Sequence, residues 1–510
     1  MALKSNESPG VTIKEFDLSG TVPSVTSTTG AFVGDFAWGP VGQPVFVANE
    51  SELVSKFGSP KDGGSSSDFL AVSQFLKYSG SAFVVRVGSG NAATDGPFTA
   101  KALGKSGENI EVVVSTTGSS VVGDDDFDGV DVAVYYGDSL VESFPYLSSQ
   151  EGSTNTGEFQ SGDSNYFIEV INRKSQWVSV DSTINGLNVG TYKLAAASEV
   201  TVEDNDRDLA AVAAFADVDQ IQIDFVCSHN IKEDTAIEIA EGRKDCVAIV
   251  SPPTAPASVD DVISWADGTP EVAAVPADNE GNGGSAAVPA IPGVPSSSHL
   301  VLDGNWVQVY NKYMDRYEMI PACSSTAGIM AATDLEAAPW FSPAGTRRGQ
   351  YFGVSALAFN PTKGDRDVMY KARVNPIVSM PGQGTVLFGD KTALSRPSAF
   401  DRINVRRLFL VIERAIGEAA KNVMFELNDD FTRAEFTNIV EPFLREVQGR
   451  RGITDFRVVC DETNNTAEVI DRNEFVASCF IKPARSINYV TLNFVAVRTG
   501  VEFEEVVGQI

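Results

Sequence analysis

Histidine is almost absent from this chain. Only His229 and His299 occur among 510 residues, and no Gly-x-Ser-x-Gly elbow or cysteine–histidine signature accompanies them. Because histidine is the usual general base near neutral pH, its scarcity argues against most acid–base and nucleophilic enzymes. Carboxylates are plentiful but lie in charge-rich turns, where solvation alone explains them. The sequence indicates no catalytic residue and no cofactor site, and a soluble carboxylate-dependent hydrolase is the weakest alternative that it leaves.

Cysteine is scarce as well, and its number is odd. The five cysteines are scattered along the chain: Cys227, Cys246, Cys323, Cys460 and Cys479. Each lies in or beside an apolar run, which predicts buried free thiols rather than disulfides. Cys227 and His229 could form one pair of metal ligands, but no second pair stands at ligand spacing, so we expect no metal site.

Long apolar runs are missing. No stretch of about 18 consecutive apolar residues occurs, so we expect neither a membrane span nor a membrane partner. The N-terminal sequence MALKSNESPG lacks the apolar core of a secretory signal. We therefore expect a protein that is made and assembled in a cytoplasm-like space.

Positive charge is in deficit, with 39 lysines and arginines against 68 acidic residues and a net charge of −29. Residues 396–510 hold 15 basic and 18 acidic side chains, whereas the first 395 residues hold 24 and 50. A nucleic-acid partner is not expected, because phosphate binding requires a basic surface. We expect the nearly neutral C-terminal part to pack against copies of itself and the acidic remainder to face solvent.

The most informative stretch runs from Arg396 to Gly500. Apolar residues recur there at spacings of three and four: Ile403, Leu408, Phe409, Ile412, Ile416, Ala419, Ala420, Val423, Met424 and Leu427. This rhythm predicts a long amphipathic helix that Asn428–Asp430 ends, and a second helix follows over 433–448. Strand-like runs come next, at 456–460, 475–481 and 487–497. Two helices on a small sheet would form a compact α/β unit.

Both ends of the chain resemble one known family. The order VRRLFLVIERAI, FELND, FRVVCDETNNT and FIKPARSINYVTLNF resembles the C-terminal core of contractile tail sheath proteins of myophages. Near the N-terminus, SPGVTIKEFD and then TGAFVGDFAWGPVGQPVFVANESELVSKFG are similar to the opening of that family; the matched regions cover about the first 90 and the last 130 residues. The resemblance implies a structural protein that polymerises as stacked helical rings around a tail tube. Contraction of these rings would drive the tube through the host envelope during genome ejection.

The resemblance also implies partners and a location. The expected partners are further copies of the chain, a tail tube protein, and baseplate and tail terminator proteins, and the expected location is the tail of a virion assembled in the host cytoplasm. The sheath of a phage-derived injection device, of the tailocin or secretion type, stays open as an alternative. The long acidic insertions favour the virion.

Changes of composition along the chain predict a multi-domain α/β (α+β) architecture. The expected parts are an N-terminal arm (1–20), an α/β segment packing with the core (21–95), an inserted β-rich protrusion domain (96–200), a central α/β domain (201–395), a C-terminal sheath core domain (396–498) and a C-terminal arm (499–510). The core domain is expected to be two helices plus a sheet, joined by the N-terminal segment.

Within the two middle parts the expected elements differ in kind. In the insertion, strand-like runs separated by Gly, Ser, Asp and Asn are found at 110–115, 130–136, 165–172 and 176–180, which predicts a β-domain. In the central domain, a strand at 221–226, a helix at 233–243 and a strand at 246–250 predict a parallel crossover. The runs 307–310, 320–322 and 356–359 are expected to extend that sheet.

The two ends of the chain are predicted to be arms. Val11, Ile13 and Phe16 alternate with other residues near the N-terminus, and Val501 and Phe503 alternate with glutamates near the C-terminus. A lone terminal strand must pair, either with its own domain or with a neighbouring subunit. The resemblance implies the second, so we expect these five residues to link subunits. We also expect one of the two C-terminal helices to face the tube.

Two motif-like stretches have simpler explanations. Asp124, Asp126 and Asp128 echo the start of a calcium loop, but its twelfth position is Tyr135 rather than glutamate, so a solvated acidic turn is expected over Asp124–Asp128. The stretch 382–392 has the glycines and the Lys-Thr pair of a phosphate loop, but Asp390 precedes the lysine and would repel a phosphate. In sheath-like proteins a similar segment leads into the long helix, so we expect a structural connection.

Overall fold

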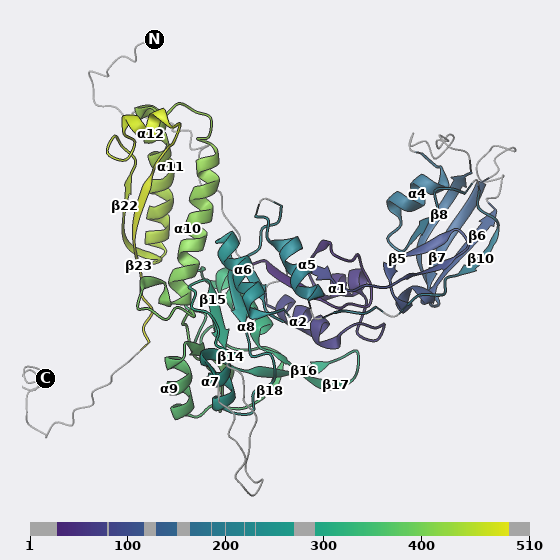
Figure 1. Ribbon diagram of the computed structural model, residues 1–510, viewed down its shortest axis with the longest axis horizontal. Helices are drawn as coiled ribbons and strands as arrows, with labels where there is room; N and C mark the ends of the chain where they lie inside the picture. The colour runs from purple at the N-terminus through teal and green to yellow at the C-terminus, as the bar shows by residue number, and fades with distance from the viewer. Residues whose placement is uncertain are drawn as a thin grey trace, which may run out of the picture.

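The computed structural model of the protein describes residues 28–78, 81–116, 129–149, 164–269 and 291–488, apart from residues 185, 199, 204, 219 and 230. Figure 1 shows the described chain as an elongated molecule, with a helical C-terminal unit at one end and a β-rich unit at the other. A large sheet with helices lies between them. The predicted multi-domain α/β architecture is confirmed.

The centre of the molecule is a seven-stranded sheet in the order β19-β15-β12-β11-β1-β3-β2. Its strands are β1 (Gly30–Gly34), β2 (Pro44–Val47), β3 (Ala82–Arg86), β11 (Phe225–Cys227), β12 (Val247–Val250), β15 (Leu300–Asp303) and β19 (Val374–Asn375). All neighbours are parallel except the edge strand β2, which runs antiparallel to β3. The N-terminal strands thus share one sheet with strands that come some 200 residues later.

Helices cover both faces of this sheet, which explains why its strands are apolar on both sides. One face carries α5 (Asp206–Phe215), α6 (Glu233–Arg243), α7 (Val259–Asp267) and α9 (Lys363–Lys371). The other carries α1 (Glu50–Phe57), α2 (Ser66–Leu76), α8 (Cys323–Glu336) and α10 (Ile403–Lys421). The predicted strand–helix–strand crossover is confirmed, since β11 and β12 pair in parallel on either side of α6 in the sequence.

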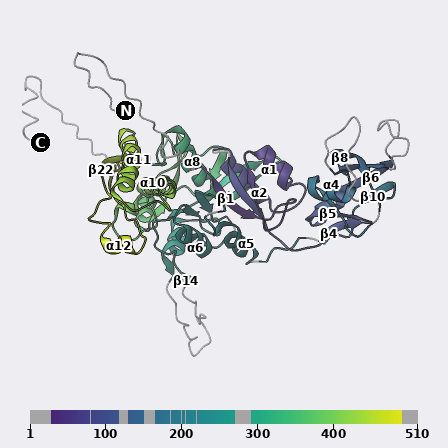
Figure 2. The same ribbon diagram turned by 90° about the horizontal axis from the view of Figure 1, so that it is seen from above.

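The insertion forms a separate β-rich unit that projects away from the central sheet (Figures 1 and 2). One sheet has the order β4-β5-β9 and the other β10-β6-β7-β8. The strands are β4 (Ala92–Asp95), β5 (Phe98–Leu103), β6 (Ile110–Thr116), β7 (Gly129–Tyr136), β8 (Ser139–Ser148), β9 (Val178–Val180) and β10 (Gly190–Lys193). Trp38 anchors this unit to the central one, because its ring lies 4.7 Å from that of Trp177.

One strand predicted in the insertion is wrong. The run 165–172 contains the start of a helix, α4 (Phe167–Lys174), rather than a strand. Phe167, Ile168, Val170 and Ile171 are all buried, so the helix puts one apolar stripe against the β-sheet core. Eight residues are about two turns, which is too short for the 3.6-residue period to stand out in the sequence.

The prediction that residues 307–310, 320–322 and 356–359 extend the main sheet is also wrong. They contribute to a separate three-stranded antiparallel sheet in the order β17-β16-β18. Its strands are β16 (Trp306–Asn311), β17 (Arg316–Pro321) and β18 (Val354–Leu357), and a hairpin of β20 (Ile377–Met380) and β21 (Gly384–Leu387) lies nearby. The short tight turn after Asn311 joins β16 to β17 and forces the antiparallel pairing. A small pair of strands, β13 (Gly268–Thr269) and β14 (Ile291–Pro292), completes this part.

The C-terminal unit contains the two predicted helices, α10 and α11 (Asp430–Gly449). They pack with β22 (Ile453–Val459), α12 (Ala467–Asp471) and β23 (Ser478–Pro483) around an apolar cluster that includes Leu408, Ile412, Phe436, Val440 and Leu444. The first helix ends at Lys421, six residues before the predicted end, and Phe425 then takes a left-handed φ of 71°. Asp429, predicted to terminate the first helix, instead caps the second, where it accepts a bond from the Thr432 backbone N–H at 2.9 Å.

Candidate functional site

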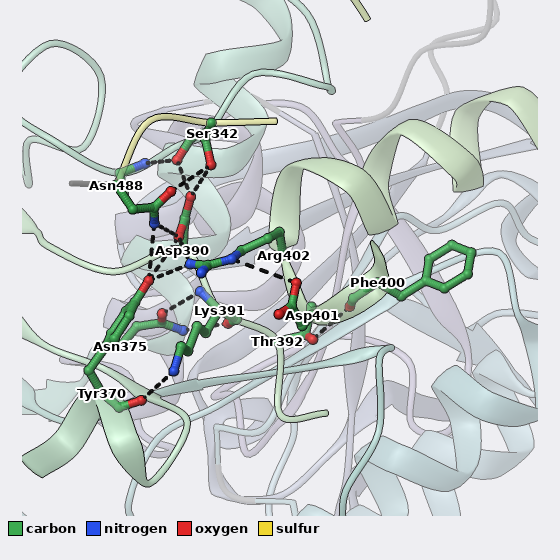
Figure 3. Close-up of polar contacts among 12 residues, drawn as sticks. Ser342, Tyr370, Asn375, Asp390, Lys391, Thr392, Phe400, Asp401, Arg402 and Asn488 are labelled. Atoms are coloured by element: carbon green, nitrogen blue, oxygen red, sulfur yellow. Dashed lines mark hydrogen bonds and ion pairs between the residues drawn. The ribbon is translucent and has the colours of Figure 1, made fainter. Parts of the chain in front are cut away.

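A buried carboxylate joins the central unit to the C-terminal unit. Asp390 follows β21 and accepts hydrogen bonds from Arg402 Nη1 at 2.8 Å and Asn488 Nδ2 at 2.7 Å, both on the C-terminal side. It also accepts bonds from the hydroxyls of Tyr370 on α9, at 3.2 Å, and of Ser486, at 2.8 Å. Figure 3 shows Tyr370, Arg402 and Asn488 converging on Asp390 from separate segments. The carboxylate is therefore a structural joint between the two units.

The neighbouring lysine is also used in structure. Lys391 Nζ donates to the Tyr370 backbone carbonyl at 2.7 Å and lies 4.1 Å from the centre of the tyrosine ring. Its own backbone N–H donates to Asn375 Oδ1 at 2.8 Å (Figure 3). Burial, together with the adjacent Asp390 carboxylate, raises the pKa of Tyr370 to about 12, so its hydroxyl stays protonated. The stretch 382–392 thus forms a connection that leads into α10, as the sequence predicts.

Helix α10 is fixed to the central sheet by a second set of contacts. Arg414 Nη1 donates to Asp224 Oδ1, just before β11, and Arg414 Nη2 donates to the backbone carbonyls of Ile223 and Asp245. About two helical turns earlier on α10, Arg407 Nη2 donates a hydrogen bond to Asp334 Oδ2 on α8. Burial raises the pKa of Asp224, and the charge of Arg414 opposes that shift. Because these charges are buried, they hold α10 in one position on the sheet.

The small sheet of the C-terminal unit has open edges. β22 and β23 pair only with each other among the described residues. One face packs on α11, while Phe480 on β23 is 61% exposed and Ile487 beyond it is 85% exposed. A two-stranded sheet with exposed apolar side chains is a template for a further strand.

The described residues contain polar clusters but no arrangement that indicates a reaction. His229 Nε2 lies 3.0 Å from Asp68 Oδ1 in the buried interior, and Arg207 bonds the other oxygen of the same carboxylate. No group of three or more His, Cys, Asp or Glu side chains in the described ranges could hold a metal ion. All five cysteines are free, three of them buried. No helix of the described chain is long and apolar enough to cross a membrane.

The residues predicted to link subunits belong to the two ends of the chain. Val11, Ile13, Phe16, Val501 and Phe503 lie outside the described residues, as does the Asp124–Asp128 turn. The residues that do join the units, Asp390, Arg402 and Arg414, were not predicted as a site. Asp390 was singled out only as an obstacle to phosphate binding, and nothing in the sequence points from Arg414 to a partner 190 positions earlier.

Comparison with known proteins places this architecture in a family. Residues 27–87 match the model "Tail sheath protein Gp18 domain III N-terminal region", residues 233–393 match the phage tail sheath protein central domain, and residues 395–496 match the phage tail sheath C-terminal domain. Together these models cover the C-terminal unit and every strand of the central sheet except β11 (Phe225–Cys227), and they leave out the projecting β-rich unit.

Curated relatives carry the name tail sheath protein. That of Enterobacteria phage T4 is 37% identical over 383 residues, covering 70% of this chain and 55% of the relative. That of Vibrio phage KVP40 is 46% identical over 273 residues, covering 52% of this chain and 39% of the relative. The chain thus spans about half the length of the curated relatives it matches, or less.

Solved structures share the fold at low identity. The sheath tail protein of Listeria innocua has a TM-score of 0.58 at 14% identity, covering 90% of this chain and 96% of that one. The contracted sheath of an extracellular contractile injection system, PVC, has a TM-score of 0.56 at 12% identity, covering 99% and 100%. Family models at both ends and in the centre, and relatives above 35% identity, lead to one conclusion: the chain belongs to the phage tail sheath protein family.

Proposed function

We propose that this protein is the structural subunit of a contractile tail sheath. Copies polymerise as stacked helical rings around a tail tube, and contraction of the array drives the tube through the host envelope during genome ejection. The tube protein, the baseplate and the tail terminator are its partners in the virion, and assembly takes place in the host cytoplasm. No catalysis, cofactor, nucleic acid or membrane is part of this function. Membership of the tail sheath family supports it.

The observation that carries the proposal is the incomplete sheet of the C-terminal unit. β22 and β23 form a pair whose outer edges have no partner strand within the described residues. Both termini supply strand-like segments, around Val11, Ile13 and Phe16 and around Val501 and Phe503. Strand addition from neighbouring copies would complete the sheet and link subunits through backbone hydrogen bonds. Such links survive large relative movements when the arms have slack.

The internal joints suit a subunit that moves as a rigid body. Asp390 and Arg414 fasten α10 to the central sheet through buried polar contacts. A contraction that shifted α10 against the sheet would leave those charges unpaired at a cost of several kcal/mol. Movement is therefore assigned to the contacts between copies, and the energy released comes from the lower free energy of the contracted packing.

The division of the chain also belongs to the proposal. The segments 1–20 and 499–510 are assigned to linkage, 96–200 to a protrusion on the outside of the assembly, and 396–498 to the inner core next to the tube. The charge distribution supports this order, since 396–510 carry 15 basic and 18 acidic residues and the rest of the chain is strongly acidic. One helix of the C-terminal pair faces the tube.

A second setting for the same activity is a phage-derived injection device. The fold likeness to the contracted sheaths of the PVC and anti-feeding prophage systems favours it, with TM-scores of 0.56 and 0.55. The virion is preferred, because identity to phage tail sheath proteins reaches 46%, against 12 and 14% for these two injection sheaths.

Deletion of residues 1–20 tests the linkage. The variant should unfold at the same temperature as the full chain, because the arm pairs only between subunits, but it should form no tubes. Thermal unfolding, size-exclusion chromatography and electron microscopy provide the readouts. Normal tubes from the shortened chain would refute the role of the N-terminal arm.

A further inference from the structure

A basic cavity of about 1030 Å³ lies between the central and C-terminal units, beside the Asp390 joint. Helix α9 and the residues after β21 line one side of it, and the end of α11 and the start of β22 line the other. Small-molecule sites in proteins measure about 300–1,000 Å³, so the cavity has room for a ligand. Six cationic side chains line it: Arg347, Arg348, Lys363, Arg366, Arg451 and Arg485.

The positive charge of the basic cavity is not balanced among the described residues. None of the six cations forms an ion pair with any of them. Two carboxylates line the cavity, Asp367 and Asp390, and Asp390 is already paired with Arg402 at 2.8 Å. Burial and the adjacent charge of Arg347 lower the pKa of Arg348. A bound anion would relieve the repulsion between these cations.

Two of the guanidinium groups are held in place by the cavity wall. Arg348 Nε donates to the Ser342 backbone carbonyl at 3.1 Å, and its guanidinium stands 5.1 Å from the ring centre of Phe341. The guanidinium of Arg366 stands 5.1 Å from the ring centre of Phe388. A guanidinium has five N–H donors, so each of these groups keeps donors for a ligand. Because they are positioned in advance, less conformational entropy is lost when an anion binds.

A buried amide at the cavity also points to an occupant, independently of charge. The side chain of Asn404 lines the cavity and is only 4% exposed. Its Oδ1 accepts no hydrogen bond from any described residue. Buried acceptors in folded proteins normally have a donor. A hydrated or partly protonated anion in the cavity would supply one.

The density of cations favours phosphate groups over an acidic peptide. An extended peptide presents side chains to one face only about every 7 Å. An oligophosphate joins its charged groups through single oxygen atoms, and each group carries several strong acceptor oxygens. Five of the six cations are arginines, whose planar donor fork binds phosphate oxygens in pairs. A short chain of phosphates therefore matches the lining better than a row of carboxylates does.

We propose that the basic cavity binds an oligophosphate anion, which bridges Arg366 on the central side and Arg451 on the C-terminal side. Lys391 takes no part, because its Nζ donates to the Tyr370 backbone carbonyl. The bound anion adds a second fastening between the two units, next to the one at Asp390. This site goes beyond the proposed function and does not depend on it.

Titration calorimetry of the full chain with tripolyphosphate at low salt tests the site. The unmodified chain should bind one anion per copy. Arg366→Gln with Arg451→Gln removes one cation from each side and should weaken binding at least about tenfold, since charge-assisted hydrogen bonds are lost. Arg173→Gln with Lys174→Gln makes the same change of charge on α4, far from the cavity (Figure 1), and should bind normally. No binding by the unmodified chain, or equal binding by the cavity variant, would overturn the proposal.

Two further ligands define the chemical class. ATP that binds as tightly as tripolyphosphate assigns recognition to the phosphate chain alone, and ATP that binds at least about tenfold tighter adds a contact to the nucleoside. Both results agree with an oligophosphate site. A tetraglutamate peptide should bind at least about tenfold more weakly than tripolyphosphate at the same ionic strength. Equal affinity for the peptide would overturn the assignment to phosphate.

Chemical labelling of the unmodified chain locates the ligand without any variant. Acetylation of Lys363 should become about tenfold slower when the concentration of tripolyphosphate is about ten times its dissociation constant. Lys61 is exposed and lies outside the cavity, so its rate should not change. Equal rates at Lys363 with and without the anion would overturn its place in the basic cavity.

Discussion

Arg402 Nη1 donates to Asp390 Oδ1 at 2.8 Å, and this contact ties the start of α10 to the connection that leaves the β20–β21 hairpin. Asp390→Asn would keep the shape of the side chain but remove its charge and turn one acceptor into a donor. We expect the free energy of unfolding to fall by about 1–3 kcal/mol, measured by chemical denaturation. Asp367→Asn, an exposed carboxyl on the neighbouring α9, should change it by less than about 0.5 kcal/mol. Equal effects from the two variants would contradict the role of Asp390 as a joint.

The ion pair between Arg414 and Asp224 gives a second prediction. Arg414→Met would leave Asp224, which is 8% exposed, without its cation. We expect a loss of about 3–5 kcal/mol in the free energy of unfolding, because the carboxylate is left buried and uncompensated. Arg445→Ala removes an exposed partner of Glu441 on α11 and should cost less than about 1 kcal/mol. A loss below 1 kcal/mol for Arg414→Met would show that α10 is held by packing alone.

Asp303 at the end of β15 predicts a dependence of stability on pH. Burial raises its pKa from 3.8 to about 7, although hydrogen bonds from Ser251 and Thr326 oppose the shift. The folded protein therefore retains a proton that the unfolded chain releases near pH 4. The contribution of Asp303 to the free energy of unfolding is therefore lost as pH rises from about 4 to 7, and it does not change further above that range. The Asp303→Asn variant has no carboxyl that could ionise at this position. It should therefore be more stable than the unmodified chain at pH 7.5, by an amount on the order of 1–4 kcal/mol.

The difference in stability between the Asp303→Asn variant and the unmodified chain should vanish near pH 4. Thermal unfolding at pH 4.5, 6 and 7.5 measures it. The exposed carboxyl Asp471 provides the control, since Asp471→Asn should leave the pH profile unchanged. A constant difference between Asp303→Asn and the unmodified chain across this range would show that Asp303 does not titrate there.

The cysteines should react in two classes. Cys227, Cys246 and Cys323 are buried, and burial raises their thiol pKa values. Alkylation of the native protein at pH 8, followed by mass spectrometry, should leave these three unmodified for hours. Cys460 and Cys479 are only half-buried and should react slowly. Rapid modification of all five in the native state would contradict the packing of the central sheet.

Local patterns in the sequence predicted the elements that are long enough for their apolar period to repeat several times. The apolar rhythm of α10 and α11 and the crossover β11–α6–β12 are of this kind, and all three are confirmed. Helix α4 was mistaken for a strand, since eight residues do not reveal their period. The end of α10 was misplaced because Val423 and Leu427 continue the rhythm although the backbone turns at Phe425.

Long-range contacts were beyond such patterns. Asp390 collects partners from residues 342 to 488, and Arg414 finds Asp224 only because the fold brings α10 onto the sheet. The cavity between α9 and the ends of α11 and β22 has the same origin. The six cations that line it come from four separate stretches of chain: Arg347 and Arg348, Lys363 and Arg366, Arg451, and Arg485. The arms were predicted from alternation and family resemblance, and they remain a prediction because they lie outside the described residues.

Electron microscopy of the full chain tests the central claim most directly. The purified protein would be imaged in negative stain at moderate salt, alone and after co-assembly with a tail tube protein. The sheath function predicts long, hollow, striated tubes with rings stacked along their axis. Dispersed particles in both preparations would contradict it.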